Sequence, residues 1–254
     1  MKTYRRLVVA LVGILLAGSL LISLNSIVRD IPVVADIESL PVIIIDPGHG
    51  GIDGGAVGVG DIVEKDINLD ISLALRDMFM VSGFDVIMTR DTDISIHDEG
   101  VQGTKKQKTS DLRNRLAIAN AQPSAIFISI HQNKFGSASS HGAQMFYGVK
   151  NEQSESLAKL IQERFRSDLQ DDNTRQIKKA GKDLYLMYNV DCPAVLVECG
   201  FLSNPGDAAM LSDGDYRAKI AFTTYAAILE FLGMDTTDGA AIQPRQTVNS
   251  GSGS

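Results

Sequence analysis

The sequence predicts an α/β domain in which a mostly parallel sheet of about six strands lies between two layers of helices. Three observations support this class. Short, wholly apolar runs such as residues 42–45 suit strands that are buried on both faces. Segments with apolar side chains at helical spacing alternate with these runs along the chain. Glycine-rich or polar segments separate the two kinds of element, as is typical of parallel strands joined by crossover helices.

The elements follow one another in a regular order. In residues 65–81 apolar side chains recur at helical spacing from Ile67 to Met78, and Gly83 ends this helix. A later helix stops before Pro123, which disfavours helical backbone in the residue that precedes it. The pattern predicts strands over residues 42–45, 84–89, 125–130, 142–147 and 194–197. It predicts helices over residues 65–81, 111–120, 153–169 and 216–232, and a mobile loop rich in glycine and lysine over residues 99–110.

The N-terminus has the pattern of a membrane segment. Basic residues within residues 1–6 precede an uncharged, mostly apolar stretch over residues 7–28. This length matches the roughly 20 residues that span a bilayer as a helix, and the basic flank is expected to stay in the cytoplasm. We therefore expect an exported protein with a membrane anchor, and a cleaved signal peptide is the alternative. Residues 29–40 would then form a linker, residues 41–233 the α/β domain and residues 234–254 a disordered tail.

Charge and cysteine content narrow the function classes. Residues 1–30 carry a net charge of +3, so the rest of the chain carries −10 of the total of −7. An acidic exported body is a poor nucleic-acid binder, and we expect no nucleic-acid partner. Cys192 and Cys199 would lie roughly 23 Å apart in an extended segment, far beyond the roughly 4.4–6.8 Å of a disulfide. We expect both to be buried and unpaired, with Cys199 pointing away from the side of the strand that carries Glu198.

Three polar clusters follow apolar runs and bring reactive side chains to predicted strand ends. His49 follows the first strand, His131 closes the third, and Glu198 closes the last. Glu64 lies across a glycine-rich loop, at the entry to a helix, where the loop can fold it back over the strand ends. Sheets of this class bind ligands at the carboxyl ends of their strands, and two imidazoles with carboxylates suit a zinc site that activates water. The sequence therefore points to a metal-dependent hydrolase.

The two carboxylates have different alternative explanations. Taken alone, Glu64 is also consistent with an acidic residue in the first turn of a helix, where the helix dipole stabilises a negative charge. Glu198 lies inside an apolar run, so its buried carboxylate needs a proton, a partner or a metal. We take Glu198 as the group that accepts a proton from water and returns it to the leaving amine.

Four further polar residues are candidates for supporting roles. Asp46 would orient the histidine that follows it, and Asn133 would fix His131 or hold substrate. Arg90 and Arg115 would pair with buried carboxylates, and the alternative is a bidentate contact with a substrate carboxylate.

Taken together, these residues resemble the zinc-dependent N-acetylmuramoyl-L-alanine amidases of the third amidase family. The resemblance runs from about Val42 to Leu232. It is carried by Ile45-Asp46-Pro47-Gly48-His49-Gly50-Gly51, Glu64-Lys65 with Asn68-Leu69, Thr89-Arg90 with Asp93, Leu112 with Arg115 and Ala119-Asn120, Phe127-Ile128-Ser129-Ile130-His131 with Asn133, and Val195-Leu196-Val197-Glu198-Cys199-Gly200-Phe201-Leu202-Ser203-Asn204-Pro205.

The resemblance implies an activity and a role for each site residue. It implies that His49, Glu64 and His131 hold about one zinc ion per chain and that Glu198 is the catalytic glutamate. The bond cleaved would be the amide between the lactyl group of N-acetylmuramic acid and the L-alanine of the peptidoglycan stem peptide.

Within that family the chain looks most like the germination-specific amidases of spore formers, which strip stem peptides so that muramic-δ-lactam forms in the spore cortex. The N-terminal segment and residues 142–147 carry this narrower likeness. It implies action on the outer face of a bacterial membrane, in the cell wall or spore cortex. Because no inserted inhibitory helix is evident, we expect any control to come from an accessory protein, bound at the acidic surface or at residues 105–108.

Three other functions stay open at this point. The first is a general cell-wall amidase of division or lysis. The second is a wall-binding module that keeps the fold without catalysis. The third is a zinc exopeptidase that acts on free peptides.

Overall fold

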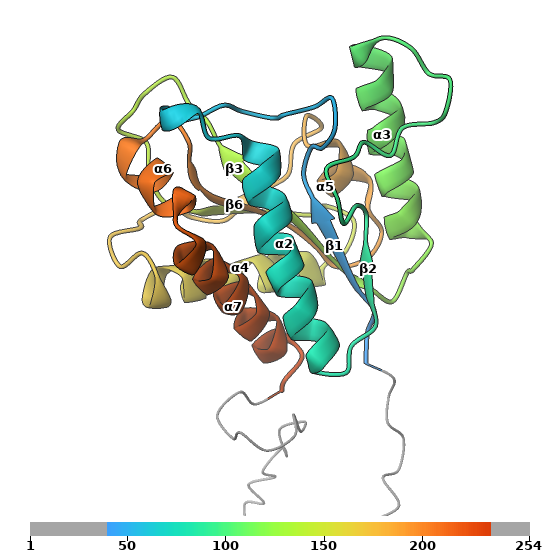
Figure 1. The fold of residues 1–254 in the computed structure, drawn as a ribbon. Helices are drawn as coiled ribbons and strands as arrows, with labels where there is room; N and C mark the ends of the chain where they lie inside the picture. The colour runs from blue at the N-terminus through green and yellow to red at the C-terminus, as the bar shows by residue number, and fades with distance from the viewer. Residues whose placement is uncertain (1–39, 235–254) are drawn as a thin grey trace, which may run out of the picture. The chain divides into compact units, whose positions relative to one another are not determined.

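Six strands form the central sheet in the computed structural model, which describes residues 40–234 (Figure 1). Their spatial order is β2-β1-β3-β6-β4-β5, and neighbouring strands are parallel except for β4 against β6. The strands are β1 (Ile43–Pro47), β2 (Val86–Met88), β3 (Ile126–Asn133), β4 (Gln144–Tyr147), β5 (Lys178–Lys179) and β6 (Ala194–Phe201). The predicted α/β class and its mostly parallel sheet are confirmed.

Helices cover both faces of this sheet. The helices are η1 (Val59–Asp61), α2 (Glu64–Val81), α3 (Thr104–Asn120), α4 (Gln153–Asp168), α5 (Tyr185–Asn189), α6 (Pro205–Ser212) and α7 (Gly214–Phe231). Helix α7 packs against both α2 and α4, and these three helices cover one face, whereas α3 and α5 lie on the other (Figure 1).

Side-chain alternation determines which residues face α3 and α5. Ile44, Phe127 and Leu196, from three adjacent strands, belong to the buried core that includes these two helices. Because successive side chains of a strand point to opposite faces, residues two and four positions further along lie on this face as well. In the parallel register His131 of β3 is the partner of Glu198 of β6. The apolar core on this face therefore gives way to polar side chains at the carboxyl edge of the sheet.

The segment from residue 99 to residue 110 differs from the prediction of a mobile loop. Helix α3 begins at Thr104, directly after Gly103, and includes the second half of this segment. Lysine and glutamine are good helix formers, but the buried side chains of α3 start only at Ser110. The first turns therefore lack the apolar repeat from which a helix is predicted.

Strands β3 and β6 extend further than predicted. β6 continues to Phe201, so Glu198 lies within the strand and does not close it. Between the pairs His131–Glu198 and Asn133–Phe201 the register shifts, with one extra residue on β6. Bulges of this kind often re-aim a side chain next to an active site.

Several predicted segments lie outside the described residues. These are the basic flank 1–6, the apolar segment 7–28, the linker as far as residue 39, and residues 235–254 of the tail. Between residues 40 and 234 no helix combines the length and apolar character needed to cross a membrane.

Cys192 and Cys199 are both free and buried, as predicted. Burial raises the pKa of the Cys192 thiol to about 11 and also raises the pKa of the Cys199 thiol. Both thiols therefore stay protonated at neutral pH and pack as small apolar side chains.

Phe79 tests how strongly the core between α2 and α7 supports the fold. Its fully buried ring lies edge-on to Phe84 and Tyr225, with centroid separations of 5.3 and 5.0 Å. We expect Phe79→Ala to lower the free energy of unfolding by about 3–5 kcal/mol, because it loses buried area and leaves a cavity. The control Phe222→Ala changes a ring on α7 that is 57% exposed, and should cost less than about 1 kcal/mol. Urea denaturation of both variants measures the difference, and equal losses would contradict this view of the core.

Candidate metal centre

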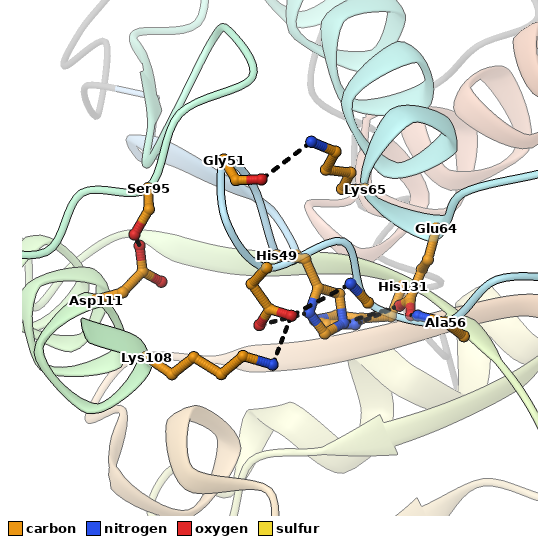
Figure 2. Close-up of polar contacts among 12 residues, drawn as sticks. His49, Gly51, Ala56, Glu64, Lys65, Ser95, Lys108, Asp111 and His131 are labelled. Atoms are coloured by element: carbon orange, nitrogen blue, oxygen red, sulfur yellow. Dashed lines mark hydrogen bonds and ion pairs between the residues drawn. The ribbon is translucent and has the colours of Figure 1, made fainter. Parts of the chain in front are cut away.

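The side chains of His49, Glu64 and His131 converge above the carboxyl edge of β1 and β3 (Figure 2). One potential ligand atom from each residue lies within 4.8 Å of the other two. Glu64 Oε1 is shared, because it lies 3.2 Å from His49 Nε2 and 2.9 Å from His131 Nδ1. Two imidazole nitrogens and one carboxylate oxygen make up a donor set that hydrolytic zinc sites use, with a further position left for water. The residues present therefore fit such a metal.

Glu64 is the first residue of α2, and its carboxylate is held from several sides. Oε2 accepts the backbone N–H of Ala56 at 2.8 Å, and Oε1 accepts the backbone N–H of Gln132 at 3.1 Å. Burial alone would raise the pKa of Glu64, but the contacts with His131 and His49 hold it well below its usual range. The carboxylate is therefore ionised at neutral pH, as a metal ligand must be.

Two loop glycines are required by the close approach of these side chains. A Cβ atom on Gly48 would collide with the imidazole ring of His131. A Cβ atom on Gly55, which has a φ of 69°, would lie 2.5 Å from Glu64 Oε2 and 2.7 Å from His49 Cδ2. The glycine-rich loop thus makes room for the three converging residues.

His49 is oriented by Asp53, which the sequence analysis did not single out. His49 Nδ1 lies 3.0 Å from Asp53 Oδ2, and Asp53 Oδ1 lies 2.7 Å from Lys108 Nζ of α3. Burial lowers the pKa of His49, but hydrogen bonds to Asp53 and Glu64 outweigh it and raise this pKa to about 9. A carboxylate on the second ring nitrogen is the usual way to orient a metal-binding histidine. In the sequence, the signal for Asp53 was its position four residues after His49.

Asp46 does not contact His49, contrary to the prediction. It is fully buried in β1, where it accepts hydrogen bonds of 2.6 Å from the hydroxyls of Thr89 and Ser129. A third bond of 2.6 Å comes from Arg115 Nη1. Burial alone would raise the pKa of Asp46, but the Arg115 guanidinium and the two hydroxyls hold it below its usual value. Strand geometry explains the difference, because Asp46 points from β1 toward α3.

Arg115 links α3 to the backbone that leaves β1. Its side chain is 2% exposed and forms ion pairs of 2.6 Å with both Asp46 and Asp111. It also donates to the carbonyl oxygens of Pro47 and His49, at 2.8 and 2.6 Å. Arg115 thus fixes the chain at the residue that carries the first imidazole.

Arg90 does not form the predicted ion pair with a buried carboxylate among the described residues. Its guanidinium donates to the carbonyl oxygens of Pro47 at 2.9 Å, Gly48 at 3.0 Å and Lys65 at 2.9 Å. It forms no ion pair with any residue in the part of the chain that the structure describes. Burial, reinforced by the charge of Arg115, lowers the pKa of Arg90 to about 10. Backbone carbonyls take the place of the carboxylate, because four of them, including that of Thr92 at 3.1 Å, accept from this arginine.

Asn133 does not fix His131 either. Within residues 40–234 its side chain forms no hydrogen bond, and its carbonyl oxygen accepts the Leu202 N–H at 2.8 Å. The register shift of β3 against β6 lies between His131 and Asn133, so His131 lies opposite Glu198 and Asn133 lies opposite Phe201. His131 is held instead by Glu64, beside which Asn68 donates to the Gly48 carbonyl at 3.2 Å.

Glu198 lies beside the cluster without a hydrogen-bonding partner among the described residues. Its Oε2 is buried and unpaired, while the residue as a whole is half-buried. Burial raises the pKa of Glu198 to about 7, helped by the charge of Glu64 and opposed by His131 and His49. A carboxyl group with such a pKa can both accept and donate a proton near neutral pH.

The comparisons with known proteins agree with this site. A family model described as N-acetylmuramoyl-L-alanine amidase matches residues 43–230. The germination-specific N-acetylmuramoyl-L-alanine amidase of Bacillus subtilis is 42% identical over 190 residues, which are 75% of this chain and 79% of that protein.

Solved structures show the same fold. The CwlD amidase from Clostridioides difficile, in complex with the GerS lipoprotein, matches with a TM-score of 0.72 and 40% identity. The match covers 76% of this chain and 98% of that chain. The amidase AmiC2 of Nostoc punctiforme matches with a TM-score of 0.64 and 26% identity, over 76% of this chain and 97% of that chain.

Arg115→Lys tests the anchoring of the backbone at His49. Lysine keeps the charge but lacks the planar fork that reaches two carboxylates and two carbonyl oxygens, so we expect a loss of about 2–3 kcal/mol in the free energy of unfolding. The control Arg113→Lys changes an exposed arginine of the same helix and should stay within about 0.5 kcal/mol of the parent. Denaturant unfolding measures both variants. A neutral Arg115→Lys would show that the fork is dispensable.

Proposed function

Because this chain belongs to the N-acetylmuramoyl-L-alanine amidase family, we propose that zinc held by His49, Glu64 and His131 supports its hydrolysis of peptidoglycan. The bond cleaved is the amide between N-acetylmuramic acid and the L-alanine of the stem peptide. The observation that carries the proposal is the convergence of three ligand atoms within 4.8 Å, beside a carboxyl group whose pKa is raised to about 7.

The division of labour follows from the contacts of each residue. Zinc bound at such a site supplies a Lewis acid, which acidifies a water molecule and polarises the scissile carbonyl group. The ionised Glu64 and the two imidazoles are the groups that would hold it. Asp53 keeps the His49 ring in place through the nitrogen that faces away from Glu64.

Glu198 has the properties of the proton carrier. At neutral pH a carboxyl group with a pKa of about 7 is present in both protonation states. Glu198 would accept a proton from the attacking water and then deliver it to the nitrogen of the leaving L-alanine. Its Oε2 is buried beside the cluster and bonds to no other described group, so no protein partner competes for the proton.

The spore cortex is the setting that the relatives favour. The identity of 42% to a germination-specific amidase supports a role in cortex peptidoglycan, where removal of stem peptides precedes formation of muramic-δ-lactam. Action in the cell wall or cortex also agrees with an exported chain that the apolar residues 7–28 anchor to the membrane or direct across it. A general cell-wall amidase of division or lysis is the second candidate.

An accessory protein is the partner we propose for regulation. The support is the solved complex of CwlD with the GerS lipoprotein, in which a relative of this chain is bound to a second protein. A non-catalytic wall-binding module is disfavoured, because it would have no need to keep a metal-ligand set and an unpaired acid together.

New chain ends on digested peptidoglycan test the reaction. We expect the protein, supplied with zinc, to release stem peptides with free L-alanine amino groups and to leave the glycan strands uncut. Amino-end labelling and a reducing-sugar assay measure the two outcomes on the same digest. New reducing ends, or cleavage of free peptides alone, would contradict the proposed reaction.

Two substitutions separate the metal ligands from the proton carrier. We expect Glu198→Gln to lower kcat by at least about 100-fold while zinc stays bound, because an amide neither accepts nor donates a proton near neutral pH. Glu64→Gln should instead lower the zinc content, since a neutral amide is a poor ligand.

Zinc content by elemental analysis and turnover of muropeptides provide the two measurements. Glu163→Gln, an exposed position on α4, is the matched control and should match the parent in both. Loss of zinc in Glu198→Gln would make Glu198 a ligand.

A further inference from the structure

The metal centre opens into a groove between α3 and α5. Two adjoining pockets of about 140 and 170 Å³ make up this groove. Both are lined by His131, Leu112 and Leu186, so the groove passes over the cluster with apolar walls on either side. Lys108 lines only the first pocket and Tyr185 only the second, so the two directions away from the cluster differ in chemistry.

Of the two basic side chains that line the first pocket, Lys108 is the one with unused N–H donors. The guanidinium of Arg115 also lines this pocket, but its nitrogens already donate to Asp46, Asp111 and two backbone carbonyls. The Lys108 side chain is 47% exposed, and among the described residues its ammonium group pairs with Asp53 Oδ1 at 2.7 Å. An ammonium group has three N–H donors, so Lys108 can keep Asp53 and bind a second carboxylate.

The spacing along α3 suits a peptide that leaves the metal centre. Lys108 and Leu112 are four residues apart and therefore lie on the same face of the helix, about 5–6 Å between their Cβ atoms. Leu112 is 37% exposed and lines the first pocket together with His131. Lys108 lines the same pocket, with its ammonium group 2.7 Å from Asp53, whose other oxygen contacts His49. An apolar contact and a cation thus border one pocket beside His131, which suits a small apolar residue next to an acidic one.

We propose that Lys108 is a specificity-determining residue that binds the free carboxylate of the residue following L-alanine in the stem peptide. The proposal rests on the proposed function and deepens it. A glutamate joined to the next residue through its side chain keeps its α-carboxylate free, and this group lies one residue beyond the scissile amide. The ammonium group of Lys108 pairs with that carboxylate, while the alanine methyl group packs against Leu112.

A structural role for Lys108 predicts a different outcome. If Lys108 served only to hold Asp53, and through it His49, its loss would affect every substrate alike. It would also weaken zinc binding, because Asp53 would orient the imidazole less well.

The test compares two muropeptides that differ only in whether the α-carboxyl group of the second residue is free or amidated. With zinc-loaded full-length protein, we expect Lys108→Gln to lower the ratio of kcat/KM for the free-acid substrate to kcat/KM for the amidated substrate roughly tenfold, mainly through a higher KM for the free acid. Lys108→Arg should retain most of the preference for the free acid. Lys105→Gln, an exposed lysine one turn earlier on α3, is the matched control and should behave as the parent.

Three results would overturn the assignment of Lys108. An equal loss on both substrates, or a fall in zinc content, would make Lys108 a structural support of Asp53. Unchanged KM for both substrates would show that the carboxylate is bound elsewhere. Failure of the parent protein to cleave either muropeptide would instead contradict the proposed function itself, so the two failures can be told apart.

Discussion

The buried pair of Arg115 and Asp46 is the interaction on which the site depends. Removing two charges from water is costly, and the cost is offset only when every donor and acceptor finds a partner. Here the guanidinium reaches two carboxylates and two backbone carbonyls, and Asp46 accepts two hydroxyl groups besides. The pair therefore joins α3, β1 and β3 at the point where the chain leaves the sheet toward His49.

The register of the strands next to this ion pair determines how the side chains of the metal centre are placed. His131 and Glu198 are register partners on neighbouring parallel strands, so both reach the same edge and the same face. Glu64 comes from the start of α2 across a loop whose glycines leave room for the imidazoles. The histidine neighbours of Glu64 lower its pKa and keep it ionised, whereas burial raises the pKa of Glu198 to about 7. Two acids with opposite shifts of pKa are suited to different roles in one reaction.

The sequence was sufficient to predict the residues that converge, but it did not reveal most of the contacts that orient them. Strand ends are visible as apolar runs, and parallel strands share a carboxyl edge, so His49 and His131 could be brought together by topology alone. The contact of Asp53 with His49 and the contacts of Arg90 with backbone carbonyls depend on the path of an irregular loop. Such a loop has no periodic sequence pattern from which its path could be predicted. The first turns of α3 were missed for a related reason, since they face solvent and carry no apolar repeat.

Anomalous X-ray scattering from crystals grown with zinc, recorded on both sides of the zinc absorption edge, tests the central claim most directly. The expected result is one peak per chain, about 2.0–2.2 Å from a nitrogen of His49, a nitrogen of His131 and an oxygen of Glu64. Glu198 should lie outside direct coordination. A peak elsewhere, no peak at this centre, or Glu198 in place of Glu64 would contradict the assignment of ligands and proton carrier.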